Sequence, residues 1–478
     1  MPGPATLAAH DRPSILVLTS VREVASVAND LTVTNWFGDL VSHPAVIVDA
    51  NSVADIVRVL KDPSAFPAPV RAVGSNHSTA RCGTADGGTL IRMKMNRILS
   101  IGTDTVTVEA GALYRDIALT LIERRLQFHV NTEIGSLSAG SAACAGTKDA
   151  SMPGEFGQVG SYVIGVKMVL PSGDLLEVTE DGDPELMKQI RCSYGTFGVV
   201  YEVTFRIRPL VPMAVHHRTF TVKEFFAALP ELRKLNYSMF FYMFLFTDRI
   251  TVEFRKYNPG ATGEPNRDVW KIRNHFWGTA GPRFGNDAEQ HIHPATLRYT
   301  IIEAFNAMWR FKLENIIKDD HTLMPDQMIH YPPVADDSRY TFSLFAFPEE
   351  QYPEILPEYT KWVNDYYEHK KYRVNLVHVG YRIEKDQQAL LSYSYDGTVL
   401  TIDPVSTGNE GWKTFLGDYN EWCSNRNGVP LLNQTFGVTE AIAKRAFGDR
   451  LGVISATRKK YDPTNRLLND YFKELFGA

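Results

Sequence analysis

The sequence has few cysteines, and they form no recognisable framework. Four occur in 478 residues, far apart and without a Cys-x-x-Cys pair: Cys82, Cys144, Cys192 and Cys423. A disulfide-rich secreted scaffold is therefore excluded, and a reducing, cytoplasmic setting is expected. The histidine pairs His216-His217 and His291-x-His293 have no acidic or cysteine partner close by in the sequence, so no metal site is expected.

Long apolar runs are also missing. The most apolar window, residues 239–246, is too short to cross a bilayer and is typical of a buried or ligand-lining strand. The first residues, Met1-Pro-Gly-Pro, lack the basic-then-apolar layout of a secretory signal. We therefore expect no transmembrane segment.

Positive charge is not in excess. Lysine and arginine number 50 against 55 aspartates and glutamates, which gives a formal net charge of −5. Nucleic acid is not an expected partner, because no surplus of cations is available to neutralise phosphates. A chain of 478 residues with 44% hydrophobic and 22% charged residues predicts a globular protein of two domains.

What the sequence does contain is two runs of small residues. The first, residues 74–78 (Gly-Ser-Asn-His-Ser), follows a β-branched strand at residues 70–73 and presents His77 at the mouth of a tight turn. The second, residues 135–148, begins at Gly135 and passes through Gly140 and Gly146 to Lys148. Backbone N–H groups in such turns approach an anion closely, so the pair predicts one long anionic ligand held by main chain.

With a third signature, these runs resemble those of the vanillyl-alcohol oxidase and p-cresol methylhydroxylase flavoprotein family, nearest to its aldonolactone and alditol oxidase branch. The family's Gly-x-Gly-His-Ser stands here as residues 74–78, with Asn76 in place of the second glycine. Its Thr-Gly-Thr-His-Gly stands as Ala-Gly-Thr-Lys-Asp at 145–149, and its Ser-Leu-Gly-x-x-Gly-Val-Val as Ser-Tyr-Gly-Thr-Phe-Gly-Val-Val at 193–200.

The resemblance implies an α+β fold, with a two-subdomain FAD-binding domain of the p-cresol methylhydroxylase type and a cap whose antiparallel sheet is covered by helices. The expected segments are a lead-in at 1–40, the FAD-binding domain at 41–212, the cap at 213–428 and a return to the FAD domain at 429–478. The sequence itself predicts strands at 45–49, 89–93 and 105–109, helices at 52–60, 295–313 and 353–367, and a short helix at 21–27.

The resemblance also implies FAD as cofactor. The residues assigned to it are Gly74, Ser75, Asn76, His77, Ser78, Gly111, Gly135, Ser136, Ser138, Ala139, Gly140, Ala143, Gly146, Thr147, Gly198, Val199 and Val200. His77 matches the histidine that relatives bond covalently to the flavin 8α carbon, which implies an 8α-histidyl linkage. The alternative is a histidine that only forms hydrogen bonds in the turn.

The cap is expected to supply the chemistry on a small-molecule substrate. Members of the branch place an acid-x-arginine pair on a central cap strand, which stands here as Gly-Tyr-Arg at 380–382 and keeps only the arginine. Their lysine position holds Gln434, and an amide is no base near neutral pH. Tyr381 is expected as proton relay, Arg382 as anion stabiliser and Gln434 as hydrogen-bonding group, with Asp403 a more distant candidate base.

The predicted function is oxidation of a CH–OH group in a sugar, polyol or lactone-like substrate by hydride transfer to flavin N5, with molecular oxygen or another electron acceptor completing the cycle. Two alternatives stay open. A biosynthetic flavoprotein could use the same cofactor for cyclisation, desaturation or epimerisation of a non-sugar metabolite. A flavin-binding protein without catalysis is the other.

Overall fold

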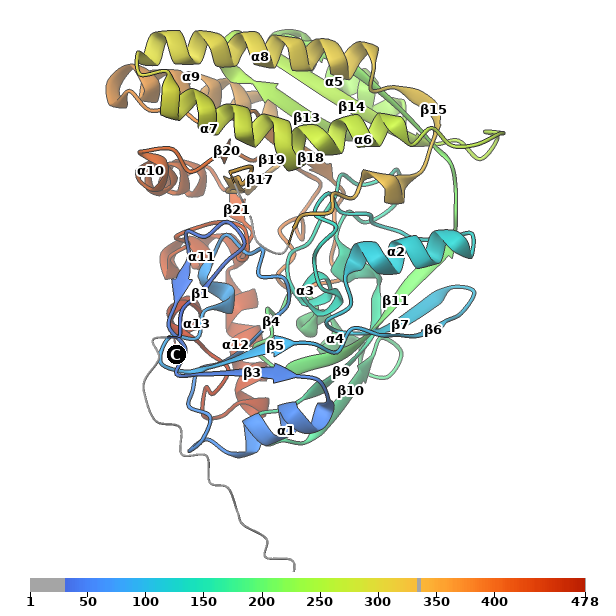
Figure 1. The fold of residues 1–478 in the computed structure, drawn as a ribbon, viewed down its shortest axis with the longest axis vertical. Coiled ribbons are helices and arrows are strands. Elements are labelled where there is room, and N and C mark those ends of the chain that lie inside the picture. The colour runs from blue at the N-terminus through green and yellow to red at the C-terminus, as the bar shows by residue number, and fades with distance from the viewer. Residues whose placement is uncertain (1–30, 333–336, 478) are drawn as a thin grey trace, which may run out of the picture.

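The computed structural model describes residues 31–332 and 337–477. The expected helix at 21–27 and most of the lead-in lie outside these residues. The described chain forms two stacked parts, with the cap above and the N-terminal part, residues 41–212, below (Figure 1). A short hairpin joins β1 (Val33–Thr34), which precedes the N-terminal part, to β2 (Val41–Ser42) at its start.

The first subdomain of the N-terminal part is a parallel sheet in the order β3-β5-β4. Its strands are β3 (Val46–Ala50), β5 (Thr89–Met93) and β4 (Val70–Val73). Helix α1 (Val53–Lys61) begins with a reciprocal capping box, in which the Ser52 side chain accepts from the Asp55 N–H and the Asp55 side chain accepts from the Ser52 N–H. Ile56, Val59 and Leu60 bury its apolar face.

The second subdomain is an antiparallel sheet in the order β10-β9-β11-β7-β6, with β8 paired to the end of β11. The strands are β6 (Ile98–Ile101), β7 (Thr105–Glu109), β8 (Leu126–Phe128), β9 (Val163–Val169), β10 (Leu175–Thr179) and β11 (Val199–Pro209). Helices α2 (Tyr114–Glu123), α3 (Ala139–Cys144) and α4 (Pro184–Ile190) complete it. The second small-residue run, expected only as a turn, therefore contains a short helix, α3.

The cap is an eight-stranded sheet in the order β15-β12-β14-β13-β18-β19-β17-β21, with antiparallel pairing throughout. Its strands are β12 (Met213–Phe220), β13 (Ser238–Phe244), β14 (Arg249–Tyr257), β15 (Asp319–Thr322), β17 (Phe345–Pro348), β18 (His378–Ile383), β19 (Val399–Ile402) and β21 (Val429–Pro430). A small pair, β16 (Thr341–Phe342) with β20 (Val405–Ser406), lies beside it.

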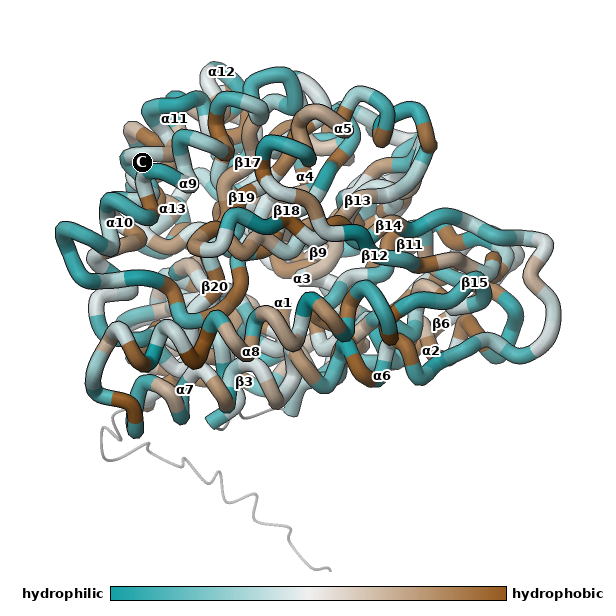
Figure 2. Tube along the Cα trace, turned by 90° about the horizontal axis from the view of Figure 1, so that it is seen from above, coloured by the Kyte–Doolittle hydropathy of each residue, from teal (hydrophilic) through white to brown (hydrophobic). Residues whose placement is uncertain are grey.

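Helices cover both faces of this sheet, as Figure 2 shows from above. One face packs against α5 (Val222–Lys234), α9 (Tyr352–Lys370) and α10 (Trp412–Ser424), and the other against α6 (Asp268–His275), α7 (Gly281–His291) and α8 (Ala295–Asn315). The apolar run at 239–246 is thereby explained: alternate residues of β13 belong to the two different cores, so every side chain of the strand is buried.

The last fifty residues return from the cap to the N-terminal part. Helices α11 (Glu440–Phe447), α12 (Asp449–Tyr461) and α13 (Asp470–Phe476) pack against one another, and α13 also contacts the turn at Arg81–Gly83 of the N-terminal part. Arg466 donates to the carbonyls of Val59 (2.7 Å) and Phe66 (2.9 Å), and Asn469 donates to that of Arg81 (2.7 Å). We retain the segment boundaries at 40, 212 and 428 as a proposal. No helix in the described part of the chain is both long and apolar enough to span a membrane.

Candidate active site

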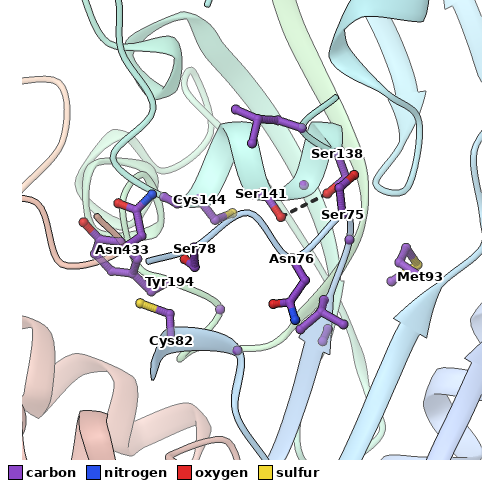
Figure 3. A pocket seen from close by; sticks show the side chains of 18 of the residues that line it. Ser75, Asn76, Ser78, Cys82, Met93, Ser138, Ser141, Cys144, Tyr194 and Asn433 are labelled. Carbon is purple, nitrogen blue, oxygen red and sulfur yellow. Dashed lines mark hydrogen bonds between the residues drawn. The ribbon is translucent and has the colours of Figure 1, made fainter. Parts of the chain in front are cut away.

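The small-residue runs line one cavity of about 1170 Å³, including its open mouth, which we call the main-chain cavity (Figure 3). Residues 70–78 of β4 and its turn form one side, and α3 with the preceding loop forms the other. The third run, residues 194–200, closes the end. Small side chains on both sides leave main-chain groups uncovered, which suits a long anionic ligand such as a dinucleotide.

The first two runs are in direct contact. A Cβ atom built on Gly74 would lie 2.0 Å from Ser138 Oγ and 2.5 Å from Ser138 Cβ. Only glycine therefore permits this approach at residue 74. Ser138 in turn donates to Ser141 Oγ at 3.0 Å, which fixes the start of α3 beside the turn.

The turn carries unused hydrogen-bond donors. The backbone N–H groups of residues 75–78 donate to no described residue. Unpaired main-chain donors are rare in folded proteins unless a ligand or water accepts from them, so the turn is suited to an anion such as a pyrophosphate. Asn76 adopts a left-handed φ of 54°, which asparagine tolerates better than other non-glycine residues, and so it takes the place of the usual glycine.

His77 lies at one end of the main-chain cavity and is covered by aromatic rings. Trp36 stacks on it with ring centres 5.2 Å apart, and Tyr331 lies at 5.9 Å. Burial lowers the pKa of His77 to about 4. The imidazole is therefore neutral near pH 7, and a ring nitrogen keeps its lone pair.

A second cavity of about 540 Å³ lies between this site and the cap, and we call it the side-chain cavity. It shares four lining residues with the main-chain cavity: Ile134, Leu137, Thr147 and Gln434. Its other walls are the aromatic and aliphatic residues Trp277, Tyr340, Phe342, Val379, Tyr381 and Val405, with Thr132, Glu133, Lys148 and Asp403. The two cavities adjoin, so a group held in the first faces a small molecule in the second.

One buried ion pair lines the side-chain cavity. Lys148 Nζ lies 3.5 Å from Asp403 Oδ2 and 3.6 Å from the centre of the Tyr381 ring. The side chains of Lys148 and Asp403 are 5% and 2% exposed. Burial raises the pKa of Asp403 to about 6, partly opposed by Lys148, and burial lowers the pKa of Lys148 against the pull of Asp403.

A second set of polar groups holds Tyr381. Its hydroxyl donates to Glu133 Oε2 at 3.0 Å, and Glu133 is paired with the fully buried Arg273. Burial raises the pKa of Tyr381 well above its usual value, so the phenol stays protonated and remains a donor. Arg273 comes from α6 and Glu133 from the loop after β8, so this set joins the cap to the N-terminal part.

Comparison with known proteins agrees with this geometry. Residues 44–179 match a family model described as FAD binding domain, and residues 203–475 match one described as D-arabinono-1,4-lactone oxidase. The second match covers more than half of the chain. The chain belongs to the D-arabinono-1,4-lactone oxidase family. It is therefore an FAD-dependent oxidoreductase of the vanillyl-alcohol oxidase class, as the motifs predict.

Relatives within this family match over most or part of the chain. L-gulono-1,4-lactone dehydrogenase of Mycobacterium tuberculosis is 28% identical over 452 residues, which cover 93% of this chain and 99% of the relative. L-gulonolactone oxidase of Bos taurus is 25% identical over 246 residues, 51% of this chain and 54% of the relative. Among solved structures, a cholesterol oxidase from B. sterolicum superposes with a TM-score of 0.70 at 15% identity, covering 93% of this chain and 96% of its own, which shows a shared fold.

Most residues assigned to FAD line the main-chain cavity. These are Gly74, Ser75, Asn76, His77, Ser78, Ser138, Gly140, Thr147, Gly198, Val199 and Val200. Six others do not line it: Gly111, Gly135, Ser136, Ala139, Ala143 and Gly146. They shape the walls from behind. A Cβ on Gly111 would lie 2.5 Å from the Met95 carbonyl, and the Ser136 hydroxyl accepts from the Tyr331 N–H at 2.9 Å.

The catalytic candidates divide between the two faces of one strand. Tyr381 lines the side-chain cavity, but Arg382 lines neither cavity and pairs instead with Glu349 at 2.7 Å and with Glu384. Neighbouring residues of a strand point to opposite faces, so both could not face one site. Gly380 cannot carry a side chain, since a Cβ would lie 2.4 Å from the Thr401 carbonyl. Gln434 lines both cavities, and its Oε1 has no partner among the described residues.

Several lining residues carry no motif and were not predicted. Lys148 stands in the family signature at the histidine position, a departure that gave the available signal. Glu133 had none, because only folding brings it to the side-chain cavity, and neither had Arg273, which pairs with it, or Trp36, which stacks on His77. His217, considered and set aside as a metal ligand, bonds to the Ile317 carbonyl (2.8 Å) and Glu253 (3.0 Å). The described residues include no group of three or more His, Cys, Asp or Glu placed to hold a metal ion.

Proposed function

We propose that the enzyme oxidises a CH–OH group of a sugar lactone or related polyol. The observation that carries this is the shared wall of the two cavities, which places any substrate in the side-chain cavity against the group in the main-chain cavity. FAD, when bound, supplies a two-electron acceptor for the hydride. The unused N–H groups of residues 75–78 and the glycine-lined walls would hold it.

The walls of the side-chain cavity favour a neutral, hydroxyl-rich ring. Trp277, Tyr340 and Tyr381 offer flat apolar faces, and the charged groups that line it are Lys148, Asp403 and Glu133. Each carboxylate is paired with a cation, Asp403 with Lys148 and Glu133 with Arg273, so the cavity offers an anionic substrate no unpaired positive charge among these groups. The relatives named for gulono-lactone and arabinono-lactone chemistry support the same substrate class.

Two predicted residues keep roles in this chemistry. Tyr381 lines the cavity and donates its hydroxyl proton to Glu133, so its oxygen is left to accept a hydrogen bond from a substrate hydroxyl. Gln434 presents an unpartnered amide oxygen where the two cavities meet, so it would orient a substrate hydroxyl. Arg382 is not retained as an anion stabiliser, because both its carboxylate partners lie outside the cavities.

We also propose a covalent 8α-histidyl bond at His77. A neutral imidazole lining the cavity is the form able to make the bond. The bond would join a ring nitrogen of His77 to the 8α carbon with loss of the imidazole proton and one methyl hydrogen, and oxygen would take up the two electrons and leave as hydrogen peroxide. The hydrogen-bonding alternative predicts a cofactor that acid releases.

Molecular oxygen is the proposed final acceptor, with another electron acceptor as the alternative, because the relatives include both an oxidase and a dehydrogenase. A cytosolic setting is proposed from the four cysteines, which are buried and free. Cell fractionation with an antibody to the protein tests the second proposal. Comparing peroxide formation in air with reduction of a dye under nitrogen tests the first.

The test of the proposed function is anaerobic mixing of the holoenzyme with a panel of aldonolactones and alditols while the flavin absorbance is followed. Bleaching by at least one neutral lactone or polyol is expected. If dithionite bleaches the flavin and the whole panel does not, the substrate class is wrong. Aldonate anions serve as matched controls, since they carry the same hydroxyls with a charge that the cavity disfavours.

A further inference from the structure

We propose that Asp403 is the base that accepts the hydroxyl proton of the substrate, and that Lys148 is the positioning residue that holds its carboxylate. This inference rests on the proposed function, because it assigns a role within the same reaction. Positions 380 and 434, where related enzymes are expected to carry an acid and a lysine, hold glycine and glutamine here. Asp403 and Lys148 supply these two residue types to the cavity from other positions.

The carboxylate of Asp403 is fixed and has one free oxygen. Its backbone is held by two hydrogen bonds to Val379, from Asp403 N–H at 2.8 Å and to Asp403 C=O at 3.0 Å. Oδ2 faces Lys148, while Oδ1 is buried without a hydrogen-bond partner among the described residues. Asp403 lines the cavity and is 1% exposed, so a substrate hydroxyl is the natural partner of Oδ1.

Glu133 is the rival carboxylate in the same cavity, but its oxygens are already engaged. Oε1 is paired with Arg273, and Oε2 accepts from the Tyr381 hydroxyl. A carboxylate with both oxygens occupied by strong donors is a weaker base than one with a free oxygen. Glu133 is therefore better suited to hold Tyr381 than to accept a proton.

Lys148 has few alternatives to Asp403. Its ammonium lies above the Tyr381 ring, and the one hydrogen bond it makes to a described side chain is to Asp403 at 3.5 Å. Lys148 comes from the N-terminal part and Asp403 from the cap, so the pair forms only when both are in place. Replacing a buried ion pair by apolar residues is often neutral or stabilising, so such a pair lining a substrate cavity is better explained by function than by stability.

The chemistry balances within the site. The O–H bond of the substrate breaks and its proton passes to Asp403 Oδ1, as the C–H bond breaks and the hydrogen leaves with its electron pair as hydride to the bound cofactor. The C–O bond becomes a carbonyl. Lys148 stabilises negative charge on Asp403 before the transfer and on the substrate oxygen during it.

The groups around Asp403 determine the pH at which its carboxyl group ionises. The charged group that faces it is the Lys148 ammonium, and the other titratable groups are phenols that burial keeps protonated: Tyr352, Tyr359, Tyr381, Tyr393 and Tyr419. Its pKa of about 6 means that the base form is present above pH 6 and lost below it. The rate of flavin bleaching should therefore rise with pH through about 6.

The test compares Asp403→Asn, Lys148→Met and Glu133→Gln with wild type in anaerobic stopped-flow bleaching between pH 5 and pH 8. Asp403→Asn should lower the limiting rate at pH 8 by about 10²–10⁴-fold, the usual range for a general base, and abolish the rise through pH 6. Lys148→Met should keep the rise but shift it to higher pH. Glu133→Gln should keep the rise in place. Flavin content and melting temperature verify that each variant is folded.

Two outcomes overturn the inference while leaving the proposed function intact. In one, wild type is bleached and Asp403→Asn keeps its rate and pH profile. In the other, the rise through pH 6 disappears in Glu133→Gln and survives in Asp403→Asn. If no compound bleaches the flavin of wild type, the proposed function is wrong. The protonation of Asp403 is then tested by infrared spectroscopy.

That measurement needs no turnover. Infrared difference spectra of the oxidised holoenzyme between pH 5 and pH 8 should contain a protonated-carboxyl band that titrates near pH 6 and is missing in Asp403→Asn. A band unchanged in that variant would show that another carboxyl titrates there, and the assignment of Asp403 would be wrong.

Discussion

The two cavities adjoin but are lined by different kinds of chemical group. The main-chain cavity is lined by glycine, serine and alanine from continuous runs, and its donors are backbone N–H groups. The side-chain cavity is lined by aromatic and charged side chains that lie far apart in the sequence, from Thr132 to Gln434. The first can hold the same cofactor in many relatives, while the second can change with the substrate.

This contrast explains why the cofactor and the chemistry respond differently to substitution. Main-chain contacts depend on close approach of the ligand to the backbone. An added Cβ should therefore weaken cofactor binding without removing a reactive side chain. Side-chain contacts depend on particular functional groups, so an isosteric change affects the rate and leaves the cofactor in place. Single substitutions in each cavity should therefore separate loss of the cofactor from loss of rate.

Gly74→Val should have the largest effect, because its branched side chain would overlap Ser138, whose Oγ lies 2.0 Å from a Cβ built on the glycine. We expect FAD content to fall by more than about tenfold, since overpacking costs about 1–3 kcal/mol or more. Absorbance of the purified protein measures it. Gly417→Ala is the control, since Gly417 lies in α10 with nothing within 4 Å of its Cβ position. Equal FAD content in both variants would contradict main-chain binding.

His77→Ala should change the type of attachment rather than the cavity. We expect flavin colour to stay with the precipitate when wild type is acidified and to pass to the supernatant for His77→Ala. The native variant should still bind FAD, because residues 75–78 keep their unused N–H groups. Colour that leaves wild type with the supernatant would show that His77 makes no covalent bond.

Tyr381→Phe should affect the rate and leave the cofactor in place. The change removes the donor to Glu133 Oε2 and leaves that oxygen with one partner fewer. A hydrogen bond to a charged group contributes about 1.5–3 kcal/mol, so kcat should fall about 10- to 100-fold. Steady-state kinetics and flavin content are the measurements. Loss of flavin together with activity would mean that Tyr381 supports the structure instead.

Arg382→Met should have the smallest effect on activity, although Arg382 is the neighbour of Tyr381. We expect kcat to change less than about twofold and the free energy of unfolding to fall by about 1–3 kcal/mol, because Glu349 loses a partner and keeps only Arg233 at 3.1 Å. Lys361→Met, at an exposed ion pair with Asp365, is the matched control and should change stability by less than about 0.5 kcal/mol. A large loss of activity with unchanged stability would show that Arg382 takes part in catalysis.

Most of the residues assigned to FAD from the sequence line one cavity, and their contact with the cofactor stays a prediction. The helix expected at 52–60, the strands at 89–93 and 105–109, and the three small-residue runs are local features, and the structure has the helix and the strands at their expected places and the runs around one cavity. Among the six assigned residues that do not line the cavity, Gly111, Gly135 and Gly146 have no room for a larger side chain. This restriction comes from packing behind the wall.

The substrate half could not be predicted in the same way. Arg382 was selected by its place in a motif. Alternation along a strand puts Tyr381 and Arg382 on opposite faces, but which of them faces the cavity depends on register, which the motif does not specify. Glu133 and Arg273 are 140 residues apart in sequence and meet only across the interface of the cap with the N-terminal part. Asp403 was considered distant, yet a backbone bridge to Val379 brings it beside Tyr381.

The central claim is that the two cavities form one site, with the cofactor against the shared wall. The most direct measurement is a crystal structure of the holoenzyme soaked with a neutral aldonolactone or its product. We expect flavin density between residues 74–78 and Gly140, and ligand density beside Tyr381 and Asp403, with the two in contact at Thr147 and Gln434. Flavin density separated from the ligand by protein at that wall, or flavin bound elsewhere, would contradict the account.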